Sequence, residues 1–152
     1  MPVKASAVLS DLKNGNYSPV YFLQGDEPYY IDEISDFVEK NAIEESQKGF
    51  NQVVMYGRDH TMGSILTQAK RYPMMSERQV VIVKEAQNIP DINNEAGSKL
   101  LSAYISNPLA TTILVFAYKN KMLDGRKALG KEIDKKAVLV TSKKLYDNQV
   151  PD

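Results

Sequence analysis

The sequence contains no cysteine, no tryptophan and a single histidine, His60. Without cysteine the chain can form neither a disulfide scaffold nor a thiolate-ligated zinc site, and it has no thiol nucleophile. One histidine argues against a Ser–His–Asp site and against a histidine-based metal centre. No apolar run approaches the roughly 18 residues of a membrane span, and the first residues lack the layout of a secretion signal. We therefore expect a cytoplasmic protein with no metal site and no membrane partner.

The residues that are present suit one folded domain with an uneven distribution of charge. The 152 residues are 43% hydrophobic and 25% charged, which is enough to bury a core. Nineteen basic residues balance nineteen acidic ones, but Lys119–Lys144 holds nine basic and three acidic residues. This local excess of positive charge is either a solvated helix face with a tail, or a surface aimed at a polyanion or an acidic partner.

Two kinds of apolar pattern alternate along the chain. Apolar residues three or four positions apart predict helices, and short continuous apolar runs predict strands that are buried on both faces. Such strands, separated by helices, indicate an α/β fold with a mostly parallel five-stranded sheet that is covered on both sides. The expected helices are 3–12, 30–42, 62–69, 100–105 and 125–135, and the expected strands are 20–23, 53–56, 80–83, 112–116 and 137–140.

The loop after the first expected strand is the usual place for a phosphate site in an α/β domain. A Walker A loop needs a second Gly, a Lys and a Ser or Thr at fixed distances from its first Gly. Counted from Gly25, those positions hold Tyr30, Ile31 and Asp32. Glu85, after the third strand, is a weak magnesium ligand by itself, and the loop also lacks Gly-x-Gly-x-x-Gly. We therefore predict no ATP hydrolysis, no catalytic residue and no bound cofactor.

Three stretches of the sequence resemble those of one known family. Residues 20–30, VYFLQGDEPYY, look like its first strand and degenerate phosphate loop. Residues 72–83, YPMMSERQVVIV, look like its helix-end motif and third strand, and the Tyr146 region resembles the segment leading into its second domain. The resemblance is to the delta subunit of the bacterial DNA polymerase III clamp loader. It implies a three-layer RecA/AAA+-like N-terminal domain at 1–142, followed at 143–152 by the start of a linker to further domains.

The resemblance also implies a function, which is binding and not catalysis. In this family the first domain binds the ring-shaped sliding clamp, the beta subunit, and helps to open it for loading onto primed DNA. The implied contact is an adjacent hydrophobic pair before the third strand, here Met74 and Met75, where other members often have Leu and Phe. The neighbours expected to join this clamp-binding site are Arg71, Tyr72, Pro73 and Arg78. The other clamp-loader subunits, gamma/tau and delta prime, are expected to bind mainly through C-terminal domains, and DNA through the assembly.

Three alternatives remain open from the sequence. Met74 and Met75 could be ordinary core residues at the C-terminus of a helix. The chain could be a nucleotide-dependent or phosphotransfer α/β enzyme with an unusual site. It could also be a DNA-binding module that uses Lys119–Lys144. Solvent exposure of the two methionines decides the first alternative, and binding measurements with ATP and with primed DNA decide the other two.

Overall fold

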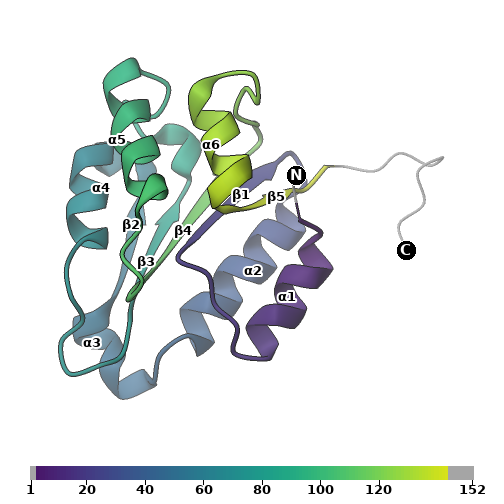
Figure 1. The fold of residues 1–152 in the computed structure, drawn as a ribbon. Coiled ribbons are helices and arrows are strands. Elements are labelled where there is room, and N and C mark those ends of the chain that lie inside the picture. The colour runs from purple at the N-terminus through teal and green to yellow at the C-terminus, as the bar shows by residue number, and fades with distance from the viewer. Residues whose placement is uncertain (1–2, 144–152) are drawn as a thin grey trace.

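Five apolar runs form one sheet in the computed structural model, which describes residues 3–143 (Figure 1). The order across the sheet is β2-β3-β4-β1-β5, and every pairing between neighbours is parallel. The three middle strands are buried along almost their whole length, as expected for strands with both faces covered. The strands are β1 (Val20–Gly25), β2 (Gln52–Tyr56), β3 (Gln79–Lys84), β4 (Thr112–Lys119) and β5 (Val138–Thr141).

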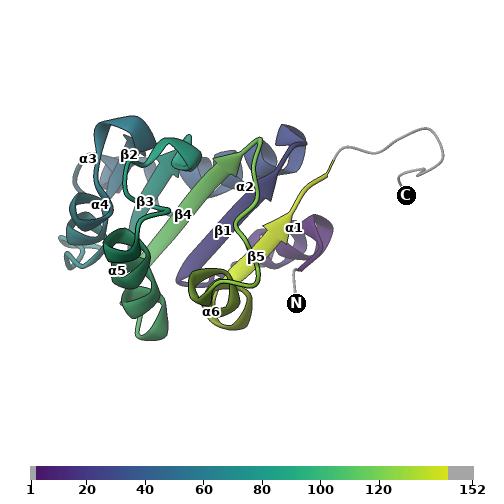
Figure 2. The same ribbon diagram turned by 90° about the horizontal axis from the view of Figure 1, so that it is seen from above.

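Helices cover both faces of this sheet and make a three-layer arrangement (Figures 1 and 2). One face packs against α1 (Ala5–Lys13) and α2 (Pro28–Asn41), and the other packs against α4 (Met62–Ala69), α5 (Glu95–Ser106) and α6 (Ala128–Lys136). A short helix, α3 (Lys48–Asn51), leads into β2, and single 3₁₀ turns lie at 45–47, 57–59 and 86–88.

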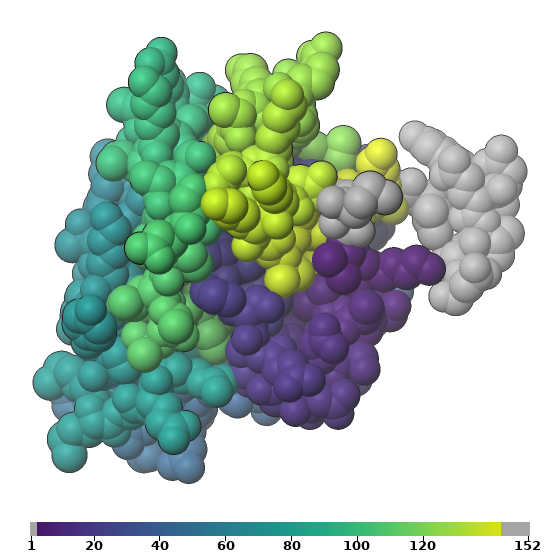
Figure 3. Space-filling model, in the orientation of Figure 1, coloured from purple at the N-terminus to yellow at the C-terminus, as the bar shows by residue number. Residues whose placement is uncertain are grey.

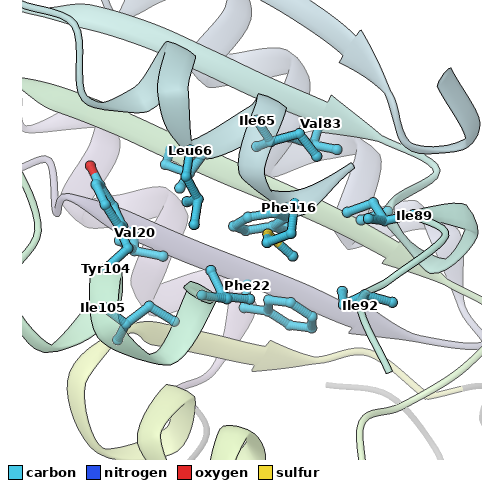
Figure 4. Close-up of a cluster of buried hydrophobic side chains, with 14 of the residues drawn as sticks. Val20, Phe22, Ile65, Leu66, Val83, Ile89, Ile92, Tyr104, Ile105 and Phe116 are labelled. Carbon is cyan, nitrogen blue, oxygen red and sulfur yellow. The ribbon is translucent and has the colours of Figure 1, made fainter. Parts of the chain in front are cut away.

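Alternate side chains of each strand enter two separate cores. Phe22 and Phe116 point toward α4, α5 and α6, where their ring centroids lie 5.6 Å apart (Figure 4). Their strand neighbours Tyr21 and Val115 enter the other core, against α1 and α2. Because both faces of β1 and β4 bury large side chains, the runs Val20–Leu23 and Ile113–Ala117 are apolar at every position and do not alternate with polar residues.

The structure confirms the α/β class, the three layers and each of the ten elements expected from the sequence. The sheet is parallel throughout and not only for the most part. The sequence did not predict α3 or the 3₁₀ turns, because four residues or fewer are too short to show a helical period. No helix within residues 3–143 is long and apolar enough to cross a membrane. The predicted linker lies, from residue 144 on, outside the described residues, so the proposed domain boundary stays a prediction.

A parallel sheet gathers its loops at two opposite edges. Loops that lead into strands lie at the amino edge, and they include α3 and residues 70–78, at the bottom of Figure 1. Loops that follow strands lie at the carboxyl edge, and they include residues 26–27, after β1, and 120–127, after β4. The degenerate phosphate loop and the predicted methionine pair therefore lie at opposite edges of the same sheet.

Candidate functional site

The phosphate loop at the carboxyl edge is closed by the protein's own hydrogen bonds. The backbone N–H of Gly25 donates to the carbonyl oxygen of Lys121 at 3.0 Å, and the N–H of Glu27 donates to that of Ser142 at 3.2 Å. The Glu27 carboxylate accepts from the N–H of Tyr29 at 3.1 Å and so caps the N-terminus of α2. These are backbone groups that a phosphate would need at this position, and the fold already uses them.

The charged groups at this edge are also directed at one another. The Lys119 ammonium, at the end of β4, lies 2.7 Å from a carboxylate oxygen of Asp32 and 3.9 Å from one of Glu85. Within residues 3–143 no group of three or more His, Asp or Glu side chains is arranged to hold a metal ion. The Lys119 ammonium is therefore already paired with carboxylates of the same protein.

The predicted methionine pair lies at the amino edge, in a loop between α4 and β3. We call residues 70–78, which hold the predicted clamp contact, the binding loop; it lies at the surface, in teal at the lower left of Figure 3. The Met75 side chain is 96% exposed and that of Met74 is 54% exposed. Tyr72 is exposed as well, while Pro73 is half-buried. The alternative that both methionines are core residues is therefore wrong.

The middle of the binding loop is held by Asn51, the last residue of α3. Asn51 is buried, and its side-chain oxygen accepts a hydrogen bond from the N–H of Met74 at 2.6 Å. Its side-chain nitrogen donates to the carbonyl oxygen of Met74 at 2.8 Å. The next residue, Met75, has a φ of 56°, a left-handed conformation that is uncommon for a residue other than glycine. The backbone of the loop is thus fixed although its apolar side chains point into solvent.

The start and the end of the binding loop are connected through the side chain of Gln79. Gln79, the first residue of β3, is buried, and its side-chain nitrogen lies 2.6 Å from the carbonyl oxygen of Arg71, just beyond α4. That nitrogen also lies 2.9 Å from the hydroxyl of Thr112. These contacts tie the segment just after α4 to the first residues of β3 and β4.

Arg78, at the end of the binding loop, packs against an aromatic ring. Its guanidinium carbon lies 4.7 Å from the centroid of the Tyr17 ring. Burial raises the pKa of the Tyr17 hydroxyl, and the nearby positive charge of Arg78 lowers it in part. Arg78 therefore has a structural contact, besides its predicted place in the clamp-binding site.

The predicted site residues lie in one segment, and the structure brings Asn51, a residue that the sequence analysis missed, into contact with it. Asn51 and the 71% exposed Phe50 come from α3, more than twenty residues before the methionine pair. A four-residue helix has no periodicity from which a surface can be predicted. The contact between Asn51 and the loop is a tertiary contact, and no local motif in the sequence indicates it.

The basic stretch Lys119–Lys144 is partly neutralised by ion pairs. Lys119 contacts Asp32, Arg126 lies 3.1 Å from a carboxylate oxygen of Asp124, and Lys136 lies 3.5 Å from one of Glu132. Lys127, the residue before α6, and Lys131 and Lys135 within it are exposed and follow one another at four-residue spacing. Lys144 lies outside the described residues. Asp124 and Glu132 belong to the stretch itself, so among these pairs only the contact of Lys119 with Asp32 lowers its local excess of positive charge.

Comparisons with known proteins agree with one another. Residues 21–143 match the family described as "DNA polymerase III, delta subunit". The chain is 29% identical over 149 residues to DNA polymerase III subunit delta of Bacillus subtilis (strain 168), covering 95% of this chain and 43% of that protein. A solved structure of the Bacillus subtilis DNA clamp loader delta protein superimposes with a TM-score of 0.80 at 28% identity, over 93% of this chain and 43% of the other.

A more distant structure supports the fold alone. It is a DNA polymerase III gamma subunit-related protein from Thermotoga maritima, with a TM-score of 0.52 at 14% identity, over 93% of this chain and 47% of the other. The chain thus spans less than half the length of these relatives. The family match, in contrast, includes all five strands apart from the first residue of β1. We conclude that the chain belongs to the DNA polymerase III delta subunit family and corresponds to its N-terminal region.

Proposed function

We propose that this domain binds the sliding clamp through Met74 and Met75 and helps to hold one clamp interface open. The observation that supports the proposal most strongly is the exposure of both side chains on a loop with a fixed backbone. The domain acts as a binding element and not as an enzyme, because its phosphate loop is closed by internal hydrogen bonds.

The energetics of the loop suit such a contact. Burying a methionine side chain in an apolar pocket contributes about 1.5–3 kcal/mol, and both side chains are available without any rearrangement of the core. The thioether side chain is flexible and adapts to a pocket of imperfect shape, including one that accepts Leu and Phe in other members. A fixed backbone lowers the conformational entropy that is lost on binding.

Clamp opening follows if the loop binds one state of the clamp more tightly than the other. A loop that fits the clamp better when its interface is open shifts the population toward the open state by that difference in affinity. The half-buried Pro73 stiffens the segment just before the pair, and the exposed Arg71 can attract an acidic clamp surface. Contacts with gamma/tau, delta prime and primed DNA belong to this proposal through the assembly.

The proposal is tested with the double variant Met74→Ala/Met75→Ala. We expect the variant to unfold at nearly the same denaturant concentration as the parent, because Met75 is almost fully exposed and Met74 is half exposed. We expect clamp affinity to fall more than 100-fold, since two anchors are lost. The matched control is Met122→Ala, which removes another exposed methionine, at the carboxyl edge, and should leave clamp affinity unchanged.

The outcome for the double variant decides the site. Unchanged clamp binding in surface plasmon resonance would show that the methionine pair is not the contact. The enzyme alternative is decided separately by titrating the protein with ATP and magnesium in a calorimeter. Because the amide groups of the phosphate loop are already bonded, we expect no magnesium-dependent heat of binding.

A further inference from the structure

The side chain of Asn51 is fully used in holding its neighbours. A side-chain amide has one oxygen that accepts and one nitrogen that donates two hydrogens. In Asn51 the oxygen accepts from the N–H of Met74, and the nitrogen donates to the carbonyl oxygen of Met74 and, at 3.2 Å, to the side-chain oxygen of Gln47. Both polar backbone groups of Met74 are therefore bonded to one buried side chain from another segment.

This contact matters because little else can fix the tip of the binding loop. The side chains of Met74 and Met75 are exposed, so they do not anchor the loop by packing against the core. The left-handed backbone at Met75 is unfavourable for methionine and persists only when its surroundings hold it. The hydrogen bonds from Asn51 act on the residue directly before this conformation.

We propose that Asn51 is a positioning residue, which holds Met74 and Met75 in the conformation that enters the clamp pocket. The proposal rests on the proposed function of the methionine pair. It adds a buried residue that does not touch the clamp itself but holds the backbone of Met74. In its absence the loop samples other conformations, and the clamp has to select the competent one from that mixture. The apparent affinity for the clamp is then the intrinsic affinity multiplied by the fraction of molecules in which the loop is correctly placed.

The test compares Asn51→Ala with a neighbouring control, Gln52→Ala. Gln52 is the next residue in the chain, and its side chain donates to the carbonyl oxygen of Glu39, away from the binding loop. We expect Asn51→Ala to weaken clamp binding about tenfold, since two hydrogen bonds to the loop are lost. Amide hydrogen exchange at Met74, measured by NMR on the free protein, should accelerate by a similar factor. Gln52→Ala should change neither value.

A second variant separates hydrogen bonding from packing. Asn51→Asp keeps the size of the side chain and an acceptor for the N–H of Met74, but an ionised carboxylate cannot donate to the Met74 carbonyl. If Asn51 acts through its hydrogen bonds, Asn51→Asp binds the clamp at least several-fold more weakly than the parent while the protein remains folded. Parental affinity for this variant would mean that only packing matters, and it would overturn the proposal.

A double-mutant comparison tests whether Asn51 acts through the methionines. In a Met75→Ala background, Asn51→Ala should cost much less affinity than it does in the parent, because the side chain being positioned is already shortened. An equal loss in both backgrounds contradicts positioning. Parental affinity of Asn51→Ala, beside a double methionine variant that does not bind, overturns only the role of Asn51. A double methionine variant that still binds overturns the proposed function itself.

Discussion

Both edges of the sheet have loops whose backbone groups are hydrogen-bonded within the protein, but the two edges expose different side chains. At the carboxyl edge, the backbone groups of Gly25 and Glu27 are bonded to other loops, and the Lys119 ammonium is paired with Asp32. At the amino edge, the backbone of Met74 is bonded just as fully, but to Asn51, and the apolar side chains are left in solvent. One edge therefore has few groups to offer to an anion, and the other offers two unburied methionines.

The two edges therefore differ in which groups they leave available to a ligand. Phosphate binding requires free N–H groups at the start of a helix, and a carboxylate cap on α2 takes the place of such a ligand. Protein binding requires exposed apolar side chains on a rigid backbone. The chain meets the second requirement at the amino edge, at a distance from the position where related folds bind phosphate.

The largest effect that would sharpen this comparison is expected from Gly25→Ala. Gly25 has a φ of 125°, and a Cβ atom there would lie 1.8 Å from the carbonyl oxygen of Ser142. Because backbone must move to make room, we expect a loss of roughly 3 kcal/mol or more in the free energy of unfolding. Denaturation in urea measures this loss.

Gly15→Ala is the control for that experiment. Gly15 also has a positive φ, of 80°, but a Cβ atom there meets no atom within 4 Å. Only the backbone strain remains, at about 1 kcal/mol. Equal stability of the two variants would contradict the close packing of Gly25 against the backbone of Ser142.

A smaller effect, on binding and not on stability, is expected from Phe50→Ala. Phe50 is 71% exposed and directly precedes Asn51, whose side chain contacts Met74 in the binding loop. We expect clamp affinity to fall several-fold, about 1 kcal/mol, because an apolar contact at the rim is lost. Titration calorimetry with the clamp measures the change.

Tyr56→Ala supplies the matched control at the other edge. Tyr56 is an aromatic residue that is 48% exposed, at the carboxyl end of β2. Removing its ring should leave clamp affinity unchanged. Equal losses for Phe50→Ala and Tyr56→Ala would mean that the two edges do not differ in clamp binding.

The smallest effect concerns the contact between Arg78 and Tyr17. Arg78→Ala removes a cation over the ring and should lower the free energy of unfolding by about 0.5–1 kcal/mol. A positive charge favours the ionised tyrosine, so its removal should raise the pKa of Tyr17 further above the ordinary value. Spectroscopic titration measures the pKa. Arg71→Ala is the control, since the Arg71 guanidinium donates to the side chain of Gln68 instead. An unchanged or lower pKa in Arg78→Ala would contradict the packing of Arg78 on the ring.

Much of the fold could be predicted from the sequence, because its signals are local. Runs such as Val80–Val83 are apolar at every position and rich in β-branched residues, which favours a strand buried on both faces. The missing Lys and Ser or Thr after Gly25 likewise exclude a Walker A loop without any coordinates. The neighbouring residues and the family resemblance indicated the methionine pair as a candidate contact. They did not indicate whether its side chains are exposed.

The sequence by itself determined the class of fold, the succession of helices and strands, and the loss of the phosphate-binding residues. Each of these depends on residues that lie next to one another in the chain. Only the tertiary structure decided that Met74 and Met75 face solvent, that Asn51 holds their backbone, and that Glu27 and Ser142 close the phosphate loop. The physical reason is that hydrogen bonds and exposure depend on segments more than twenty residues apart, which the parallel sheet brings to a common edge.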